Sequence, residues 1–374
     1  MTLHIQRHPL PAHSTGARRE LTSLHYGAQA SGRKVYIQAS LHADEIPGML
    51  VAQHLRERLE LLDAAGKIAG EIVLVPVANP VGLGQFMFGT PFGRFDLTNG
   101  VNFNRGYRDL IPQLKERLAG KLGSDARTNA RLVRSEAAAL LAQTEQSAET
   151  VAMKNTLQTL AHDADIVLDL HCDNEAALHL YTGSHLVEAT MPLARLMGAH
   201  AVLTADVSGD DPFDEACGRP WAELATHFGA GFPLGEPCLS ITVELRGEVQ
   251  VTHELARQDA TAILDFLAHA GHIDAPLVEL PAALCAATPL AAVQRIEAPH
   301  AGIVVFLREP GAQVQPGDAI VELIDPFTGV STILSATVAG PLFARVARRY
   351  AHSGMSLAKI AGTVPMRSGK LLSL

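Results

Sequence analysis

Short apolar runs alternate with amphipathic stretches over most of this sequence, and this alternation constrains the fold more than any other feature. Five runs rich in β-branched and other apolar residues predict strands, at residues 34–40, 71–79, 165–171, 176–183 and 239–245. Some of these runs are nearly continuous in apolar residues, which is typical of strands covered by helices on both faces. We therefore predict an α/β domain built on a sheet.

Two longer stretches between these runs predict helices. Residues 49–67 carry apolar side chains at helical spacing and end near Gly66, as expected for a crossover helix with a glycine stop. Residues 110–163 are rich in Ala, Leu, Arg and Glu, and they predict two or three helices inserted before the strand at 165–171. We expect these inserted helices to flank the functional site.

The pattern changes after about residue 272, where a linker-like segment leads into short β-like segments broken by Pro and Gly. We therefore predict two domains, an α/β domain over 1–275 and a small all-β domain over 276–374. The segment PGAQVQPGDAIVEL (310–323) resembles the turns of biotinyl and lipoyl carrier domains, which implies a barrel-sandwich of short strands. The corresponding hairpin tip reads DPFTG (325–329) and has no lysine, so neither modification is predicted.

Composition limits the classes of partner. With 30 Lys and Arg against 39 Asp and Glu, the formal net charge is −9, so no basic field exists to attract nucleic acid. The four cysteines have wide, irregular spacings, which argues against a disulfide framework and suits a reducing compartment. The N-terminus has no uninterrupted apolar segment, and no apolar run reaches the roughly 18 residues that span a bilayer. We expect a cytoplasmic protein with no membrane partner.

Three residues near strand ends offer ligands for a metal ion. His42 and Glu45 lie three residues apart between a probable strand and a helix, so both can point into the crevice at the carboxyl edge of the sheet. His171 ends the strand at 165–171 in a similar position. A catalytic zinc ion commonly takes three protein ligands and leaves a fourth position for water, so one zinc ion per chain is predicted. Asp169, on the same strand face as His171, is expected to orient a ligand histidine.

Each of these residues also has a simpler interpretation. His42 and Glu45 can form a capped turn at a helix start, and His171 can bond to backbone at a strand end. The combination with further residues favours the metal site.

Two more segments supply a candidate base and two cations. Glu244 lies in an otherwise apolar strand, where a lone carboxylate is costly unless it is paired, hydrogen-bonded or near a metal. It is the candidate general base, and an ion pair with Arg246 is the alternative. Arg105, preceded by Asn104, can clamp a substrate carboxylate, and Arg94 can stabilise an oxyanion. The alternative for each arginine is a surface salt bridge.

Four short motifs, in this order, resemble those of the succinylglutamate desuccinylase/aspartoacylase family of the zinc carboxypeptidase superfamily. They are His42-Ala-Asp-Glu45, Asn104-Arg105, Asp169-Leu-His171 and Val243-Glu244. The resemblance covers about residues 34–248. It implies a zinc-carboxypeptidase-like mixed sheet flanked by helices, together with a small C-terminal β domain.

The resemblance also implies a role for each motif. Zinc would be bound by His42, Glu45 and His171, and Glu244 would be the base that activates water. The Asn104-Arg105 pair would bind a substrate carboxylate, and Arg94 would be the oxyanion arginine.

Two positions depart from the family pattern. The first loop reads HADE where HGDE is frequent, and Cys172-Asp173 follows His171 where Thr often stands. Cys172 alternates to the opposite strand face from His171, so we expect it to pack rather than react. Asp173, near the metal, is the candidate for recognising a cationic group on the substrate.

The implied activity is that of a zinc-dependent amidohydrolase that cleaves the amide bond of a small N-acylated amino acid or a related compound. One alternative is a metallocarboxypeptidase that acts on short peptides. Another is a non-catalytic metal-containing binding protein. The expected partner is a small acylated amino acid, and the resemblance is compatible with a homo-oligomer.

Overall fold

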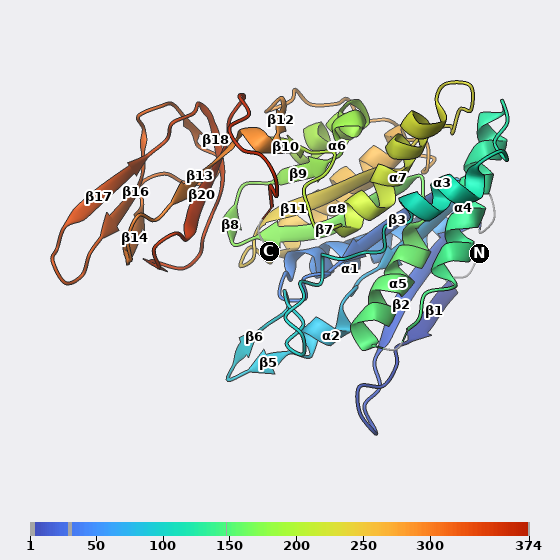
Figure 1. Cartoon of the computed structure of the whole chain (residues 1–374), viewed down its shortest axis with the longest axis horizontal. Helices are drawn as coiled ribbons and strands as arrows, with labels where there is room; N and C mark the ends of the chain where they lie inside the picture. Colours follow the sequence, from blue (N-terminus) through green and yellow to red (C-terminus); the bar gives the residue numbers. More distant parts are fainter. Residues whose placement is uncertain (1–3, 29–31, 147, 373–374) are drawn as a thin grey trace.

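The structure, a computed structural model, describes residues 4–28, 32–146 and 148–372. A nine-stranded mixed sheet forms its centre, with helices on both faces and a separate group of strands to one side (Figure 1). The strands lie in the order β1 (His4–Pro9), β2 (Glu20–Gly27), β4 (Glu71–Val75), β3 (Lys34–Ala39), β7 (Ile166–Asp173), β11 (Leu239–Gly247), β9 (His179–Thr182), β10 (Ala201–Thr204) and β12 (Ala287–Pro289).

Strands β4, β3, β7 and β11 are parallel and form the centre of this sheet. Their side chains alternate between two cores, as the two-residue period of a strand requires. On β3, Val35 and Ile37 pack into one core and Tyr36 into the other. Both faces of the central strands are therefore buried, which explains their nearly continuous apolar sequences.

One helical layer packs on each face of the sheet. The first contains α1 (Pro47–Ala64), α6 (Val187–Met197) and α8 (His253–His269). The second contains α3 (Ile111–Leu118), α4 (Ala126–Leu141), α5 (Glu149–Ala161) and α7 (Phe213–Phe228). The predicted crossover helix and the inserted helices between 110 and 163 are confirmed, the latter as α3, α4 and α5.

Four of the five predicted strands are confirmed, with changes at their ends, and the fifth is divided into two. The run at 71–79 stops at Val75, because Pro76 has no amide hydrogen to donate to the sheet. The run at 176–183 divides into β8 (Glu175–Ala176) and β9, which belong to different sheets. A short helix, α2 (Pro80–Leu83), and a small hairpin of β5 (Phe86–Met87) and β6 (Thr90–Pro91) follow β4 along the chain.

The C-terminal region is all-β, as predicted, and two antiparallel sheets enclose one apolar core. The first sheet contains β13 (Val293–Glu297), β20 (Ser356–Ala361), β18 (Gly340–Arg345) and β15 (Gln313–Val314). The second contains β17 (Ser331–Ser335), β16 (Ala319–Ile324), β14 (Gly302–Phe306) and β19 (Tyr350–Ala351).

Two strand pairings bear on the relation between this region and the α/β part. Strand β8 pairs with β18, where Arg345 contacts Glu175 at 2.6 Å. Strand β12 lies after residue 276 but pairs with β10 of the large sheet. The division at 275/276 stays a prediction, and the large sheet continues past it. Among the described segments, no helix combines the length and the apolar character needed to cross a membrane.

Candidate active site

His42, Glu45 and His171 come together at the carboxyl ends of β3 and β7. One potential ligand atom from each lies within 4.8 Å of those of the other two. Nδ1 of His42 is 2.8 Å from Oε1 of Glu45, and Nδ1 of His171 is 2.7 Å from Oε2 of the same carboxylate. All three residues are buried. Two imidazoles and a carboxylate that converge in this way form a donor set suited to zinc.

The second ring nitrogen of each histidine contacts a polar side chain. Nε2 of His42 is 2.9 Å from Oδ1 of Asn102, and Nε2 of His171 is 2.9 Å from Oδ2 of Asp169. The other oxygen of Asp169 accepts a hydrogen bond of 2.9 Å from Nε2 of the buried Gln38. Such outer partners fix the orientation of a ligand imidazole and leave its other nitrogen for the metal. The structure places Asp169 against His171, and its orienting role stays a prediction.

Glu244 lies on β11 in register with His171 on the neighbouring strand. Its Oε2 atom is buried and has no hydrogen-bond partner among the described residues. Burial, reinforced by the nearby Glu45 carboxylate, raises the pKa of Glu244 to about 8. The alternative partner, Arg246, has φ of 69° and donates instead to Asp259, at 2.9 and 2.6 Å. The Glu244 carboxylate therefore faces the metal group and is not paired with Arg246, the arginine on its own strand.

Arg94 reaches the metal group because the preceding residue is a glycine. A Cβ atom on Gly93 would lie 2.1 Å from the backbone nitrogen of Asp44, so no other residue allows the two loops to approach this closely. Nη1 of Arg94 lies 3.1 Å from Oε1 of Glu45 and 2.9 Å from Nδ1 of His42. The structure thus brings the predicted oxyanion arginine to the predicted ligands.

The turn at 102–105 carries two of the three predicted substrate-binding residues, Asn104 and Arg105. Oδ1 of Asn104 accepts from the backbone N–H of Phe213 at 2.9 Å, and its Nδ2 lies 3.5 Å from Nε2 of His171. Nη1 of Arg105 donates to the carbonyl of Asn104 at 2.6 Å. Asn104 and Arg105 line the same small cavity, of about 80 Å³, as the two histidines.

Asp173 lies at the end of β7 and contacts the C-terminal β region. Its Oδ2 accepts a hydrogen bond of 2.6 Å from Nζ of Lys359 on β20. Burial acts to raise the pKa of Asp173, but Lys359, His179 and the backbone N–H of Asn174 together hold this pKa below its usual value. Lys359 and Leu372 line the cavity beside the metal group, so the C-terminal region forms part of its wall.

The sequence patterns missed several residues of this cavity and of its surroundings. Asn102 stands two residues before Asn104, and that Asn-Phe-Asn-Arg spacing could have indicated it. Lys359 lies in β20, far from the motifs, and Tyr181 lies in β9, shortly after the His171 motif; no local signal marks either residue. Asp214, in the first turn of α7, belongs to an acidic segment, and nothing in that segment indicated that Asp214 would line the cavity.

The residues present fit a bound metal ion on two counts. The histidine nitrogens that face Glu45 belong to rings whose other nitrogens lie 2.9 Å from oxygens of Asn102 and Asp169. The buried oxygen of Glu244 lacks a partner that an ion, a water molecule or a substrate would supply. Arg94 and Arg105 add positive charge to the same cavity. The arrangement can therefore hold an ion, place a water molecule beside a carboxylate and bind an anionic substrate.

Comparisons with known proteins identify the family and the fold. A family model described as the succinylglutamate desuccinylase/aspartoacylase catalytic domain matches residues 31–270. The sequence matches none of the proteins whose functions are curated.

Solved structures similar to this chain include two from Shewanella, both described as members of the succinylglutamate desuccinylase/aspartoacylase family. The protein from Shewanella amazonensis SB2B is 29% identical, with 96% of this chain and 98% of that chain covered and a TM-score of 0.81. The protein from Shewanella frigidimarina NCIMB 400 is 26% identical, with 97% and 98% covered and a TM-score of 0.82. The ectoine utilization protein EutE (DoeB) from Ruegeria pomeroyi, at 15% identity with 97% and 96% covered and a TM-score of 0.67, shares the fold.

Proposed function

Because the chain belongs to the succinylglutamate desuccinylase/aspartoacylase family, we propose that it is a zinc-dependent hydrolase that cleaves the amide bond of a small N-acylated amino acid or a related compound. The observation that carries the proposal is the buried group of His42, Glu45 and His171 beside the partnerless carboxylate oxygen of Glu244. These are the parts that metal-assisted amide hydrolysis needs.

In the proposed reaction, His42, Glu45 and His171 hold the ion. A bound zinc ion would supply positive charge that lowers the pKa of a nearby water molecule and of Glu244, and that polarises the amide carbonyl. Glu244 accepts a proton from the attacking water at its carboxylate and passes it to the nitrogen of the leaving amine. The products are a carboxylic acid and an amine.

Four further side chains assist the reaction in this scheme, two by contacting the substrate and two by positioning other residues. Arg94 stabilises the negative charge that develops on the carbonyl oxygen. Arg105 binds the carboxylate of the amino acid through its planar guanidinium group, and Asn104 helps to fix the turn that presents it. Asp169 keeps the imidazole of His171 in one orientation.

The residues that line the cavity favour a small substrate rather than a peptide. Lys359 and Leu372, both from the C-terminal region, line the cavity together with the ligands. A metallocarboxypeptidase needs a cleft open enough for a peptide chain, and these two residues cover part of the site.

A substrate panel tests this function. Zinc-loaded protein would be assayed on N-acetyl, N-succinyl and N-formyl amino acids and on short peptides. We expect turnover of one acyl class and no release of C-terminal residues from the peptides. Peptide cleavage would instead support the metallocarboxypeptidase. A metal-replete protein inactive on a broad panel of amides and esters would support a binding protein.

Asp173 gives a prediction about substrate choice. We propose that its carboxylate helps to recognise a cationic group on the substrate, which would share the carboxylate with Lys359. Asp173→Asn should lower kcat/KM about tenfold for amine-bearing substrates, because a hydrogen bond to a charged partner is worth roughly 1.5–3 kcal/mol. Substrates without an amine should lose less, since the released Lys359 ammonium favours anions. An equal loss for both classes would contradict this role.

A further inference from the structure

Lys154 is a buried cation of α5 that the proposed reaction does not use. The residue is 8% exposed, and its Nζ donates to two backbone carbonyls, that of Asn102 at 3.2 Å and that of Arg105 at 2.6 Å. Nζ also lies 5.8 Å from the centre of the Tyr107 ring. In the described part of the chain, no carboxylate forms an ion pair with it. Lysines are seldom buried without a carboxylate partner. The role of Lys154 should therefore be sought in its two hydrogen bonds to backbone carbonyls.

The two carbonyls belong to the first and last residues of the 102–105 turn. The same Asn102 carbonyl also accepts from the backbone N–H of Arg105 at 3.1 Å, which closes the turn. The side chains of Asn104 and Arg105 line the metal cavity, whereas the carbonyls at both ends of the turn face α5. Lys154 therefore ties together the two ends of the segment that presents the proposed substrate-binding residues.

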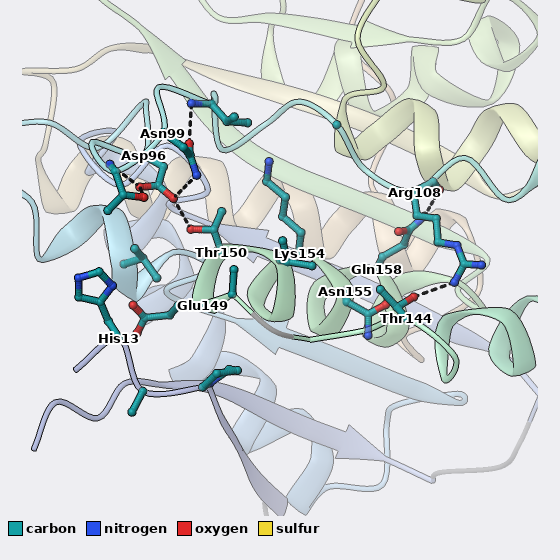
Figure 2. Close-up of a pocket in the computed structure, with 18 residues that line it drawn as sticks. His13, Asp96, Asn99, Arg108, Thr144, Glu149, Thr150, Lys154, Asn155 and Gln158 are labelled. Atoms are coloured by element: carbon teal, nitrogen blue, oxygen red, sulfur yellow. Dashed lines mark hydrogen bonds between the residues drawn. The ribbon is translucent and has the colours of Figure 1, made fainter. Parts of the chain in front are cut away.

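A second cavity, of about 600 Å³, lies beside Lys154 and shares no lining residue with the metal cavity. Figure 2 shows the lysine rising from α5 between Asp96 on one side and Arg108 on the other. The Asp96 carboxylate accepts from Thr150 at 2.6 Å and from neighbours on its own loop, so hydroxyl and amide groups engage it. Lys154 thus lies at the boundary between the turn and a space large enough for water.

The charge of Lys154 can change near neutral pH. Burial lowers its pKa to about 8, Arg105 acts in the same direction, and Asp96 opposes them. The other titratable groups that line the second cavity are His13, Arg108 and Glu149. Loss of the proton would remove one of the three donors and the charge, and hydrogen bonds from charged donors are roughly twice as strong as those from neutral ones.

We propose that Lys154 is a positioning residue whose ammonium holds the 102–105 turn in the conformation that directs Asn104 and Arg105 to the metal cavity. The identity of the ligand that Arg105 binds rests on the proposed function. The contacts of the turn with Lys154 do not.

The first test measures the turn itself. Amide hydrogen exchange of residues 102–107 would be compared in the wild type, Lys154→Met, Lys154→Arg and the control Lys121→Met, which removes an exposed lysine paired with Glu136. We expect exchange at least about tenfold faster in Lys154→Met, because a charge-assisted hydrogen bond is lost, and no change in the control. Exchange rates would be corrected for the intrinsic pH dependence of amide exchange. In the wild type, the corrected rates of the turn should rise above about pH 8, and in Lys154→Arg, which keeps its charge, they should not rise.

The second test measures substrate binding. Lys154→Met should raise KM for the acylated amino acid about tenfold while kcat falls by less, and Lys154→Arg should restore part of the loss. Metal content should stay at the wild-type level. The proposal would be wrong if the turn exchanged at the wild-type rate in Lys154→Met, or if this variant lost its metal. If the wild type hydrolyses none of the acyl substrates, the proposed function fails, and the exchange measurement still decides the role of Lys154.

Discussion

Replacing His171 with alanine is expected to remove the metal ion and to lower kcat/KM by at least about a thousandfold. The imidazole lies between Glu45 at 2.7 Å and Asp169 at 2.9 Å, and alanine leaves two carboxylates facing each other without a nitrogen ligand. Loss of an outer partner alone typically costs roughly 10- to 100-fold in metal affinity, so loss of a ligand should cost more. Elemental analysis of purified wild type should give about one zinc ion per chain, and the variant should contain little.

A buried histidine away from the site provides the matched control. His272 is 3% exposed and lies outside the cavity of the metal group, so His272→Ala reports what the loss of a buried imidazole does to folding. Thermal unfolding of both variants separates loss of metal from loss of structure. If His171→Ala kept its zinc and its activity, the assignment of this ligand would be wrong, and a metal-free wild type would return all three residues to structural roles.

The convergence of His42, Glu45 and His171 could be predicted from the sequence because it depends on local patterns and on one rule of topology. The runs before His42 and before His171 are apolar enough to identify as buried strands, and carboxyl ends of neighbouring parallel strands meet at one edge of a sheet. Strands β3 and β7 are indeed adjacent and parallel. The gap of 126 residues between Glu45 and His171 therefore did not prevent the prediction of a shared site.

The rest of the cavity could not be predicted because it depends on contacts between distant segments. Lys359 meets Asp173 across 186 residues, near the place where β8 pairs with β18 of the C-terminal sheet. The alternative ion pair of Glu244 with Arg246 assumed a regular strand. A bulge between Glu244 and Gly247 shifts the register there, and the positive φ of Arg246 turns its side chain to Asp259. Neither event leaves a pattern in the residues nearby.

Glu244→Gln should lower kcat by about a thousandfold and leave the zinc content unchanged. Glutamine has nearly the same size as glutamate but cannot accept a proton from water, and general base catalysis typically contributes roughly 10²–10⁴-fold. KM should change little, because Glu244 is not among the residues proposed to bind substrate. The matched control is Glu248→Gln, on the same segment but outside the lining of the cavity. A Glu244→Gln variant with near-normal turnover would remove Glu244 from the mechanism.

Although Glu244→Gln should lower activity, it should raise the stability of the metal-free protein. The pKa of Glu244 is raised from 4.5 to about 8, so the folded state binds this proton more tightly than the unfolded state does. Its contribution to stability is therefore present below pH 4.5 and is lost as the pH rises through about 8. Glutamine stays neutral throughout this range. The unfolding temperature of metal-free Glu244→Gln should accordingly exceed that of the metal-free wild type by more at pH 9 than at pH 6. If this difference did not grow with pH, Glu244 would have a polar partner in the folded protein. Its unpaired carboxylate could then no longer be used as support for the metal site.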